Sequence, residues 1–533
     1  MNKQITAHQL EKLHMRSIVN LDTAEALKHL GMFIDAGTDA GNPKSIDRAL
    51  RQLEILDSRQ LSDDHAVVTH YYKANAYGAL AGIHHGKSNA LTLRWNCTDT
   101  LKQMFHLNSA ISHKGFDAQN PVLQCQILTN YGNLLKEVGR VIDAIAQWDR
   151  ALSILPNFGK ARGGRGLGLA RYTSLQGEGL NKEILAQHAY DSLVSASKSD
   201  AFFESDDAEQ ANSYYQHFAN QLAGYFLIDE IREQNYLDEG ELGRTKAERA
   251  YRAWCLDNRL VLNPLNELGS WTAAAADVLT LPGLTVKISD KLNGARPPPI
   301  FGFFNQLKQE YASARFMLYE GITSNGVHFA DRQVKIAETL DYSEFSLATE
   351  RIRTAYRIAY SLLDKVAVLL NSYLGLGHED TEKLKKLSFS NVWFSKKTSL
   401  LPQIQESQNI GLCGLYWLSR ELHDGDLKLS TAADSRELHV IRNELEHKYL
   451  KVREGWAAPF IDKDAGDYAY TLGSNELEAK ALRVMEIARS ALLYLTFAIE
   501  HEELIKADSS SKALTVKMHV ETMKSSRKRR DHF

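Results

Sequence analysis

The sequence predicts an all-α protein, and three observations lead to this fold class. Apolar residues recur at the 3.6-residue spacing of helices along most of the 533-residue chain. Only 10 prolines occur, so long stretches lack the residue that most often ends a helix. No run of alternating apolar and polar residues joined by hairpin turns indicates a sheet.

The composition is that of an ordinary folded protein with no overall attraction to polyanions. Apolar residues make up 44%, charged residues 24%, and the net charge is −3, so any surface that binds nucleic acid must be local. The four cysteines form no Cys-x-x-Cys pair, which argues against a disulfide framework or a structural zinc site. The longest apolar stretch, residues 491–499, is about half of a membrane span. We therefore expect a cytoplasmic protein that binds no membrane, no metal and no cofactor.

The clearest internal pattern lies in the first half of the chain. The segment LTNYGNLLKEVGRVIDAIAQWDRALSILPN resembles a tetratricopeptide repeat (TPR), in which Gly132 and Ala144 let two antiparallel helices approach and Trp148 fills the seam. One repeat cannot bury its own faces, and looser relatives precede it, while KARGGRGLGLARY is expected to begin another. We assign residues 1–230 to a TPR-like helical solenoid, with a protein or peptide partner expected at the repeats.

The rest of the chain is expected to contain three further parts. Residues 231–295 are predicted to be a helical connector, since a proline triplet at 297–299 and scattered glycines mark a boundary near 295. Five helical patterns then predict a helical bundle over 296–505. The last part, 506–533, ends in SSRKRRDHF and predicts a basic flexible tail.

The candidate catalytic residues lie in the segment IRNELEHKYL, residues 441–450. On a helical wheel for 438–452, one arc forms a core stripe of Leu438, Ile441, Leu445 and Tyr449. Asn443 and His447 stack on the opposite side, flanked by Val440 and Leu450, and Arg442 lies at the edge between the two faces. A helix with two such faces lies either deep in a bundle or at a subunit interface.

The trio Arg442, Asn443 and His447 suits phosphodiester cleavage. A histidine moves protons near neutral pH, and an arginine holds a phosphate oxygen. In RNA the 2′-hydroxyl is an internal nucleophile, so no metal is required. Arginine and histidine at this spacing also arise by chance, as Arg59 with His65 shows, and such pairs commonly belong to a solvated helix face. The strong amphipathic helix and the adjacent asparagine distinguish the 442 site.

Residues from about 300 to 505 resemble the HEPN superfamily (higher eukaryote and prokaryote nucleotide-binding domains). These helical bundles commonly carry an Arg-polar-x-x-x-His motif, here Arg442-Asn443-Glu444-Leu445-Glu446-His447. The blocks WCLDNRLVLNPLNEL, FNQLKQEYASARFMLYEGI and RIAYSLLDKVAVLLN resemble a bacterial subgroup that joins TPR-like repeats to a HEPN domain. The resemblance implies a metal-independent endoribonuclease, active as a homodimer whose two motifs line one cleft.

The same resemblance implies 2′,3′-cyclic phosphate products and a role in toxin–antitoxin systems or antiviral defence. It leaves open an alternative, because some members have lost catalysis. Such a member is an adaptor that binds or dimerises with a protein or nucleotide partner. Four further residues are predicted to bind RNA or support the cleft: Lys448, Asp364, Lys365 and Asn371. For Asp364 and Lys365 a solvated strip is an equally good explanation, and Asn371 is the weaker candidate.

Overall fold

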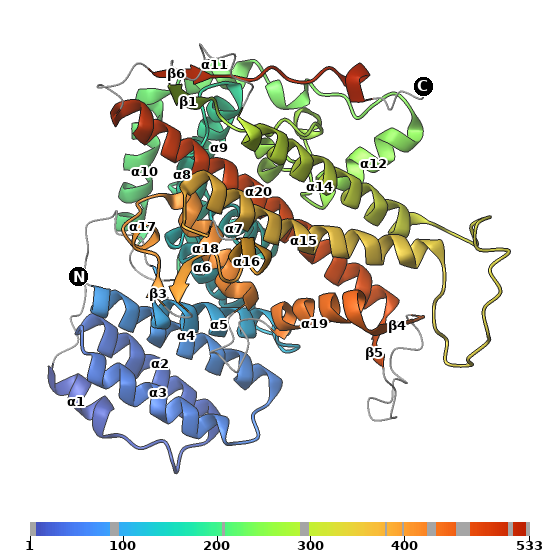
Figure 1. The fold of residues 1–533 in the computed structure, drawn as a ribbon. Coiled ribbons are helices and arrows are strands. Elements are labelled where there is room, and N and C mark those ends of the chain that lie inside the picture. Colours follow the sequence, from blue (N-terminus) through green and yellow to red (C-terminus); the bar gives the residue numbers. More distant parts are fainter. Residues whose placement is uncertain are drawn as a thin grey trace.

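Helices dominate the computed structural model, and its strands occur only as short two-stranded pairs (Figure 1). The predicted all-α class is therefore confirmed. The structure describes residues 7–85, 95–204, 208–287, 298–378, 381–396, 399–423, 433–454, 469–509 and 515–528.

The N-terminal half is a stack of antiparallel helix pairs, blue to green in Figure 1. After α1 (Ala7–Met15), the pairs are α2 (Thr23–Asp39) with α3 (Pro43–Asp57), α4 (Asp63–His85) with α5 (Thr98–Ser112), α6 (Pro121–Glu137) with α7 (Val141–Ile154), and α8 (Gly159–Ser174) with α9 (Leu180–Ala196). The last of these pairs packs against α10 (Ala208–Tyr225). This arrangement fits the predicted repeat-like solenoid.

A buried tryptophan surrounded by glycines joins α6, α7 and α8. Trp148 is fully buried, and a Cβ atom added to Gly132 would lie 2.7 Å from its indole Nε1. A Cβ on Gly164 of α8 would lie 2.6 Å from the same nitrogen, and one on Gly168 would overlap the ring. The glycine-rich stretch predicted to begin a repeat helix therefore forms α8, and its glycines make room for this ring.

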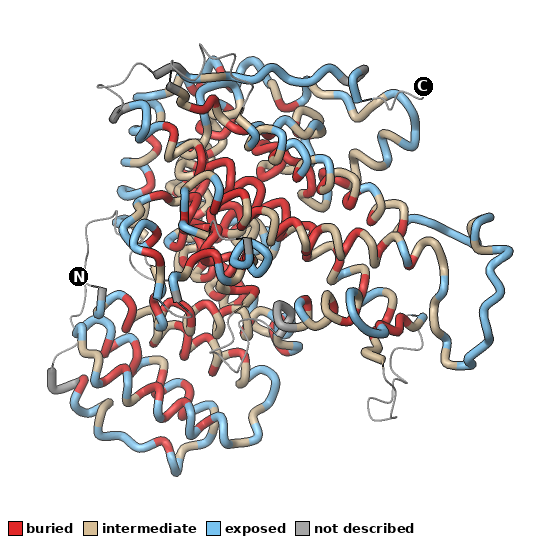
Figure 2. The backbone as a smooth tube through the Cα atoms, in the orientation of Figure 1, coloured by how far each residue is buried: buried red, intermediate tan, exposed pale blue. Residues whose placement is uncertain are grey.

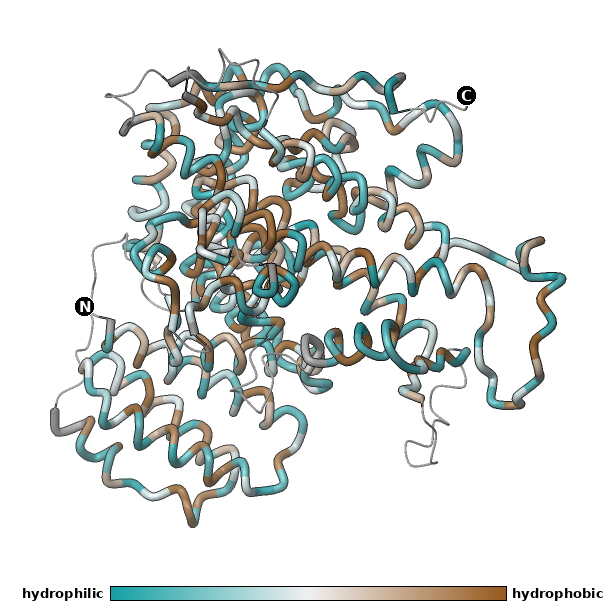
Figure 3. The backbone as a smooth tube through the Cα atoms, viewed as in Figure 1, coloured by the Kyte–Doolittle hydropathy of each residue, from teal (hydrophilic) through white to brown (hydrophobic). Residues whose placement is uncertain are grey.

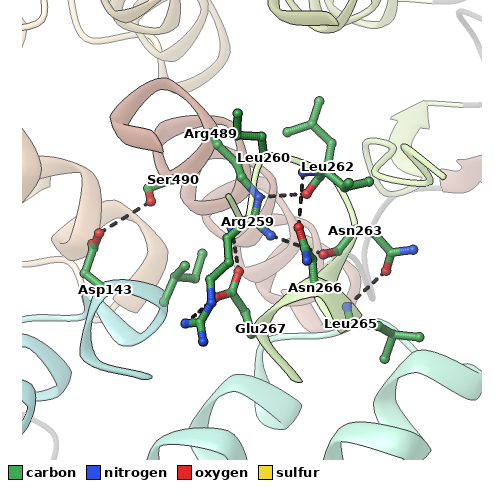
Figure 4. Close-up of polar contacts among 12 residues, drawn as sticks. Asp143, Arg259, Leu260, Leu262, Asn263, Leu265, Asn266, Glu267, Arg489 and Ser490 are labelled. Carbon is green, nitrogen blue, oxygen red and sulfur yellow. Dashed lines mark hydrogen bonds and ion pairs between the residues drawn. The ribbon is translucent and has the colours of Figure 1, made fainter. Parts of the chain in front are cut away.

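A connector of short helices follows the solenoid and is tied to the last long helix by a buried polar cluster. The connector contains α11 (Ile228–Glu233), η1 (Tyr236–Asp238), α12 (Lys246–Asp257), η2 (Pro264–Leu268) and η3 (Thr272–Ala274). Arg489 donates to the Val261 carbonyl at 2.7 Å, to Glu267 at 2.5 Å and to the Asn263 carbonyl at 3.2 Å. Figure 4 shows Arg489 between Glu267 and Asn263. Because Arg489 and Glu267 are both buried, each satisfies the other's charge.

The C-terminal part is a helical bundle built around three long helices. In it α14 (Pro299–Thr323) and α15 (Leu347–Leu374) form an antiparallel pair on α20 (Ser474–Ser509), the red helix that crosses Figure 1. Two further helices, α18 (Ile410–His423) and α19 (Ala433–His447), pack on this frame. In the chain, the short helices α16 (Thr381–Lys385) and α17 (Pro402–Gln405) come between α15 and α18. Two strand pairs complete it: β2 (Phe394–Lys396) with β3 (Ser399–Leu400), and β4 (Tyr449–Arg453) with β5 (Ala469–Gly473).

One apolar core runs through both halves. It extends from Val67 in α4 to Ile499 in α20, whereas α1 to α4 share a smaller second cluster around Leu30 and Leu53. Figure 2 shows the buried residues concentrated in the middle of the molecule, and there α20 contacts α18 and α7. The predicted boundary at residue 295 lies outside the described residues, and both boundaries, at 230 and 295, stay a prediction.

The predicted flexible tail begins with ordered structure. Lys506 to Ser509 are the last residues of α20, and residues Thr515–Met518 form β6, which pairs antiparallel with β1 (Leu284–Lys287). Nearby, the buried Glu503 carboxylate accepts from the Thr285 amide N–H at 2.6 Å. Basic composition suggested a solvated tail, but ladder hydrogen bonds hold this part on the connector.

Candidate functional site

The helix that carries the predicted motif is α19, and it packs on α15 through its apolar side. Leu438 and Ile441 are buried, and the Tyr356 hydroxyl donates to the Leu438 carbonyl at 2.7 Å. The predicted core stripe is present up to this point. It ends early, because α19 stops at His447.

The segment after His447 is a strand and not the continuation of the helix that we expected. Residues 449–453 form β4, which pairs in parallel with β5. Leu450, Lys451 and Val452 are buried, whereas Tyr449 is 45% exposed. The backbone pairing with β5 outweighs the helical spacing that the wheel detected. Tyr449 therefore lies outside the core, and Leu450 lies in it.

The polar side of α19 faces solvent in the protomer. His439, Asn443 and His447 are spaced by four residues and so follow one stripe, and Arg442 lies beside it. The two histidines are exposed, whereas Arg442 and Asn443 are half-buried. The structure therefore brings the three predicted catalytic residues onto one accessible surface at the end of a helix.

A chain of hydrogen bonds runs from Arg442 into the bundle. The guanidinium Nη1 donates to the Asn443 Oδ1 at 3.0 Å, and Asn443 Nδ2 lies 3.1 Å from His439 Nε2. The other ring nitrogen of His439 lies 3.2 Å from the hydroxyl of the buried Tyr360. Since the amide donates to Nε2, the proton of a neutral His439 is on Nδ1. Asn443 thus orients Arg442 and His439.

No carboxylate among the described residues lies within ion-pair distance of Arg442, so none neutralises its charge directly. The charge of Arg442 does act on Asp364: burial raises the pKa of this carboxyl group, and the charge of Arg442 partly offsets that rise. A guanidinium held by a neutral amide at an accessible surface is suited to binding an anion.

His447 makes no hydrogen bond or ion pair with any described residue, and its side chain is exposed. The next residue, Lys448, pairs with Glu444 at 3.0 Å on the same helix side. An exposed imidazole without a partner is available to a ligand or to another chain, whereas Lys448 is already partly neutralised.

The other predicted supporting residues lie along α15 at different distances from the trio. Asp364 accepts the Phe389 amide N–H at 2.9 Å and is close enough to Arg442 and His439 to feel their charges. Lys365 points away to Glu310 of α14, at 2.6 Å. Asn371 is buried, and it holds the loop after α15 through the backbone of His378.

Sequence reasoning missed three members of this cluster: His439, Tyr360 and His423. The rings of His423 and His439 lie 6.1 Å apart, and the His423 ring lies 6.3 Å from that of Tyr360. Burial lowers the pKa of His423 to about 4, and neighbouring His439 adds to the effect. The spacing of His439, four residues before Asn443, was a signal that the sequence offered.

Comparison with models of protein families gives a match over the C-terminal bundle. Residues 292–502 match the model of the LA2681-like HEPN family. These residues form an LA2681-like HEPN domain. Neither a curated protein nor a solved structure matches the chain. The candidate residues Arg442, Asn443 and His447 all lie inside the HEPN domain, and no described helix of the chain is both long and apolar enough to cross a membrane.

A hollow lies on the solenoid, and its lining residues fall between Ala24 and Glu204, outside the HEPN domain. It has a volume of about 1280 Å³ and is lined mainly by α2, α4 and α6. Asn130 lies within it, donating to the Tyr71 hydroxyl at 3.1 Å and to the Asn75 side chain at 3.4 Å. Side-chain amides on α4 and α6 present donors and acceptors that match a peptide backbone.

Proposed function

We propose that this protein is a metal-independent endoribonuclease that acts as a homodimer through Arg442, Asn443 and His447. The observation that carries the proposal is the accessible Arg442, oriented by Asn443 at 3.0 Å and without a carboxylate partner among the described residues. The HEPN family match supports it, since HEPN domains often bind RNA and dimerise.

In the proposed reaction, each residue of the trio has one role. Arg442 holds a non-bridging oxygen of the scissile phosphate and stabilises the added negative charge in the transition state. His447 moves the proton of the 2′-hydroxyl or of the leaving 5′-oxygen. The 2′-oxygen attacks phosphorus as the P–O5′ bond breaks, which leaves a 2′,3′-cyclic phosphate and a 5′-hydroxyl. No metal enters the scheme, and a second copy of α19 supplies the opposite wall of the cleft.

A cleavage assay on the full-length chain in excess EDTA tests this proposal. Because general acid–base catalysis contributes about 10²–10⁴-fold, His447→Ala should slow cleavage of single-stranded RNA at least about 100-fold. Arg442→Lys should also lose activity, because lysine lacks the planar fork. Glu446→Gln, a change at an exposed neighbour, is the matched control.

The result that would overturn the nuclease is cleavage by His447→Ala at the wild-type rate with the fold intact. The adaptor alternative predicts no cleavage by any of these proteins. A growth test separates the two in cells: arrest on expression of wild type but not of Arg442→Ala supports the nuclease. Growth unaffected by either protein supports the adaptor.

We further propose that the hollow on the solenoid receives a protein or peptide partner that regulates the HEPN domain. The amides of Asn75, Asn130 and Asn133 line it beside the aromatic ring of Tyr71, a combination that suits an extended backbone with apolar side chains. The continuous core from α4 to α20 offers a physical connection between the two parts. A toxin or antiviral defence effector is the biological role that this arrangement fits.

A further inference from the structure

A long loop between α14 and α15, residues 324–346, projects from the bundle and is named the arm here. It is the yellow loop at the right of Figure 1. Figure 3 shows apolar segments along it, and Figure 2 shows that it is largely exposed. Its exposed large apolar side chains are Val327 (68%), Phe329 (74%), Val334 (58%), Ile336 (52%), Leu340 (82%), Tyr342 (55%) and Phe345 (44%). Exposed apolar residues gathered in this way mark an interaction site.

The arm is held in place at its C-terminal end. The Glu344 amide donates to the Val452 carbonyl at 2.8 Å, and the Glu454 amide donates to the Tyr342 carbonyl at 3.0 Å. Lys451, which is 8% exposed, pairs with Asp341 at 2.9 Å. These contacts attach the C-terminal end of the arm to β4. The arm is therefore fixed at this end, while its large apolar side chains remain exposed.

The arm has the chemistry of a protein contact and not of a nucleic-acid contact. Its acidic residues are Asp331, Glu338, Asp341 and Glu344, and its basic residues are Arg332 and Lys335, so its net charge is −2 (two bases less four acids). A negative loop repels a phosphate backbone. Each large apolar side chain offers roughly 100 Å², so the seven together approach the about 800 Å² per partner of a standard protein interface.

The position of the arm indicates which protein it meets. It is bonded to β4, which starts two residues after His447, so the arm and the polar stripe of α19 belong to one continuous surface. Exposed Tyr449 extends the apolar patch toward that stripe. We propose that the arm binds a second copy of this chain and that two arms flank the cleft formed by the paired α19 helices. The inference rests on the proposed function, which requires two α19 helices to face each other.

This arrangement links dimer formation to the position of the catalytic histidine. The arm's hydrogen bonds reach Val452 and Glu454, and the β4 backbone leads from there directly to His447. A partner that fixes the arm therefore also fixes the end of α19. In the free protomer the same end has an exposed His447 with no described partner.

Sedimentation velocity of the full-length chain across the micromolar range tests the proposal. The variant carries Phe329→Asp and Leu340→Asp. Leu340 has φ 55°, a left-handed conformation that aspartate adopts more readily than leucine, so the fold should be retained. We expect a wild-type dimer and a dimer dissociation constant raised at least about 100-fold in the variant. The matched control, Tyr225→Asp with Leu227→Asp, changes two side chains that are 85% and 67% exposed far from the arm and should remain dimeric.

A wild-type protein that is monomeric at every concentration, or an arm variant that dimerises like wild type, would overturn the proposal. Should the variant fail a folding check by circular dichroism, hydrogen exchange of the wild type decides. Amides of the arm must then become protected as concentration rises, and unchanged exchange rejects the second copy and leaves the arm to a different protein. RNA cleavage is measured separately. A dimer that depends on the arm but cleaves no RNA would contradict the proposed nuclease and not the proposed role of the arm. Cleavage that the arm substitutions leave unchanged would contradict the role of the arm and not the nuclease.

Discussion

Arg442 is positioned by Asn443, the residue next to it, through a neutral hydrogen bond of 3.0 Å. A carboxylate partner would have held the side chain equally well but would have cancelled its charge. The neutral arrangement keeps the positive charge available for an anion, and His439 and Tyr360 hold the amide from behind. At this scale, the site consists of one oriented cation and one exposed imidazole.

The buried imidazole of His423 predicts that acid destabilises the HEPN domain. Its pKa is lowered to about 4 by burial and by His439, below the about 6.5 of an unfolded chain. The unfolded state therefore binds the proton first as pH falls from 6.5, and stability is lost down to pH 4, by up to about 3 kcal/mol. His423→Gln should show a smaller loss of free energy of unfolding across this window in urea titrations.

The matched control for the acid effect is His217→Gln, at an exposed position in the solenoid, which should keep the wild-type pH dependence. An identical acid loss in wild type and His423→Gln would show that other groups dominate. The close pair His70 and His106, whose ring nitrogens lie 3.0 Å apart, is another source that we expect. Burial lowers the pKa of His70 to about 4 and that of His106 to about 3.

Spacing within one helix was enough to predict Arg442, Asn443 and His447 as residues of one surface. It was not enough for Tyr360 and His423, because these come from α15 and α18 and meet α19 only in three dimensions. The hydrogen-bond partners of Asn443 also depend on side-chain rotamers. The sequence therefore could not show that Asn443 bonds to Arg442 and His439. The catalytic roles themselves stay a prediction.

At the scale of secondary structure, the glycines around Trp148 predict a large difference between two identical substitutions. Gly132→Ala places a Cβ 2.7 Å from a fully buried indole and should lower the free energy of unfolding by about 1–3 kcal/mol. Gly82→Ala lies in α4 with nothing within 4 Å, so it should stabilise the helix by about 0.5–1 kcal/mol. Urea unfolding followed by circular dichroism measures both, and equal effects would contradict the packing argument.

The helix pairs were predictable because their signals are local: small residues at seams, caps and first-turn prolines. Asn42 and Asn120 accept amide N–H groups at the starts of α3 and α6, each directly before a proline. The end of α19 was not predictable, because the helical spacing of Leu438, Ile441, Leu445 and Tyr449 continues past the last residue of the helix, His447. The pairing with β5, sixteen or more residues further on, fixes residues 449–453 as a strand.

At the scale of the molecule, the Arg489–Glu267 pair predicts that the halves unfold together. Glu267→Gln would leave Arg489 buried without its counter-charge, which costs about 3–5 kcal/mol. Because one core spans α4 to α20, hydrogen exchange should show faster opening in both the solenoid and the HEPN domain. The same substitution at Glu178, which is 90% exposed and paired with Lys182, should change stability by less than about 1 kcal/mol. Faster exchange confined to one half would contradict a shared cooperative unit.

The strand pair β1–β6 brackets the HEPN domain, since residues 284–287 precede it and residues 515–518 follow it. The polypeptide therefore enters and leaves this module through adjacent positions. A shortened gene that encodes only residues 292–502 would remove both β1 and β6. Recombinant work on the isolated HEPN domain should therefore retain residues 284–518.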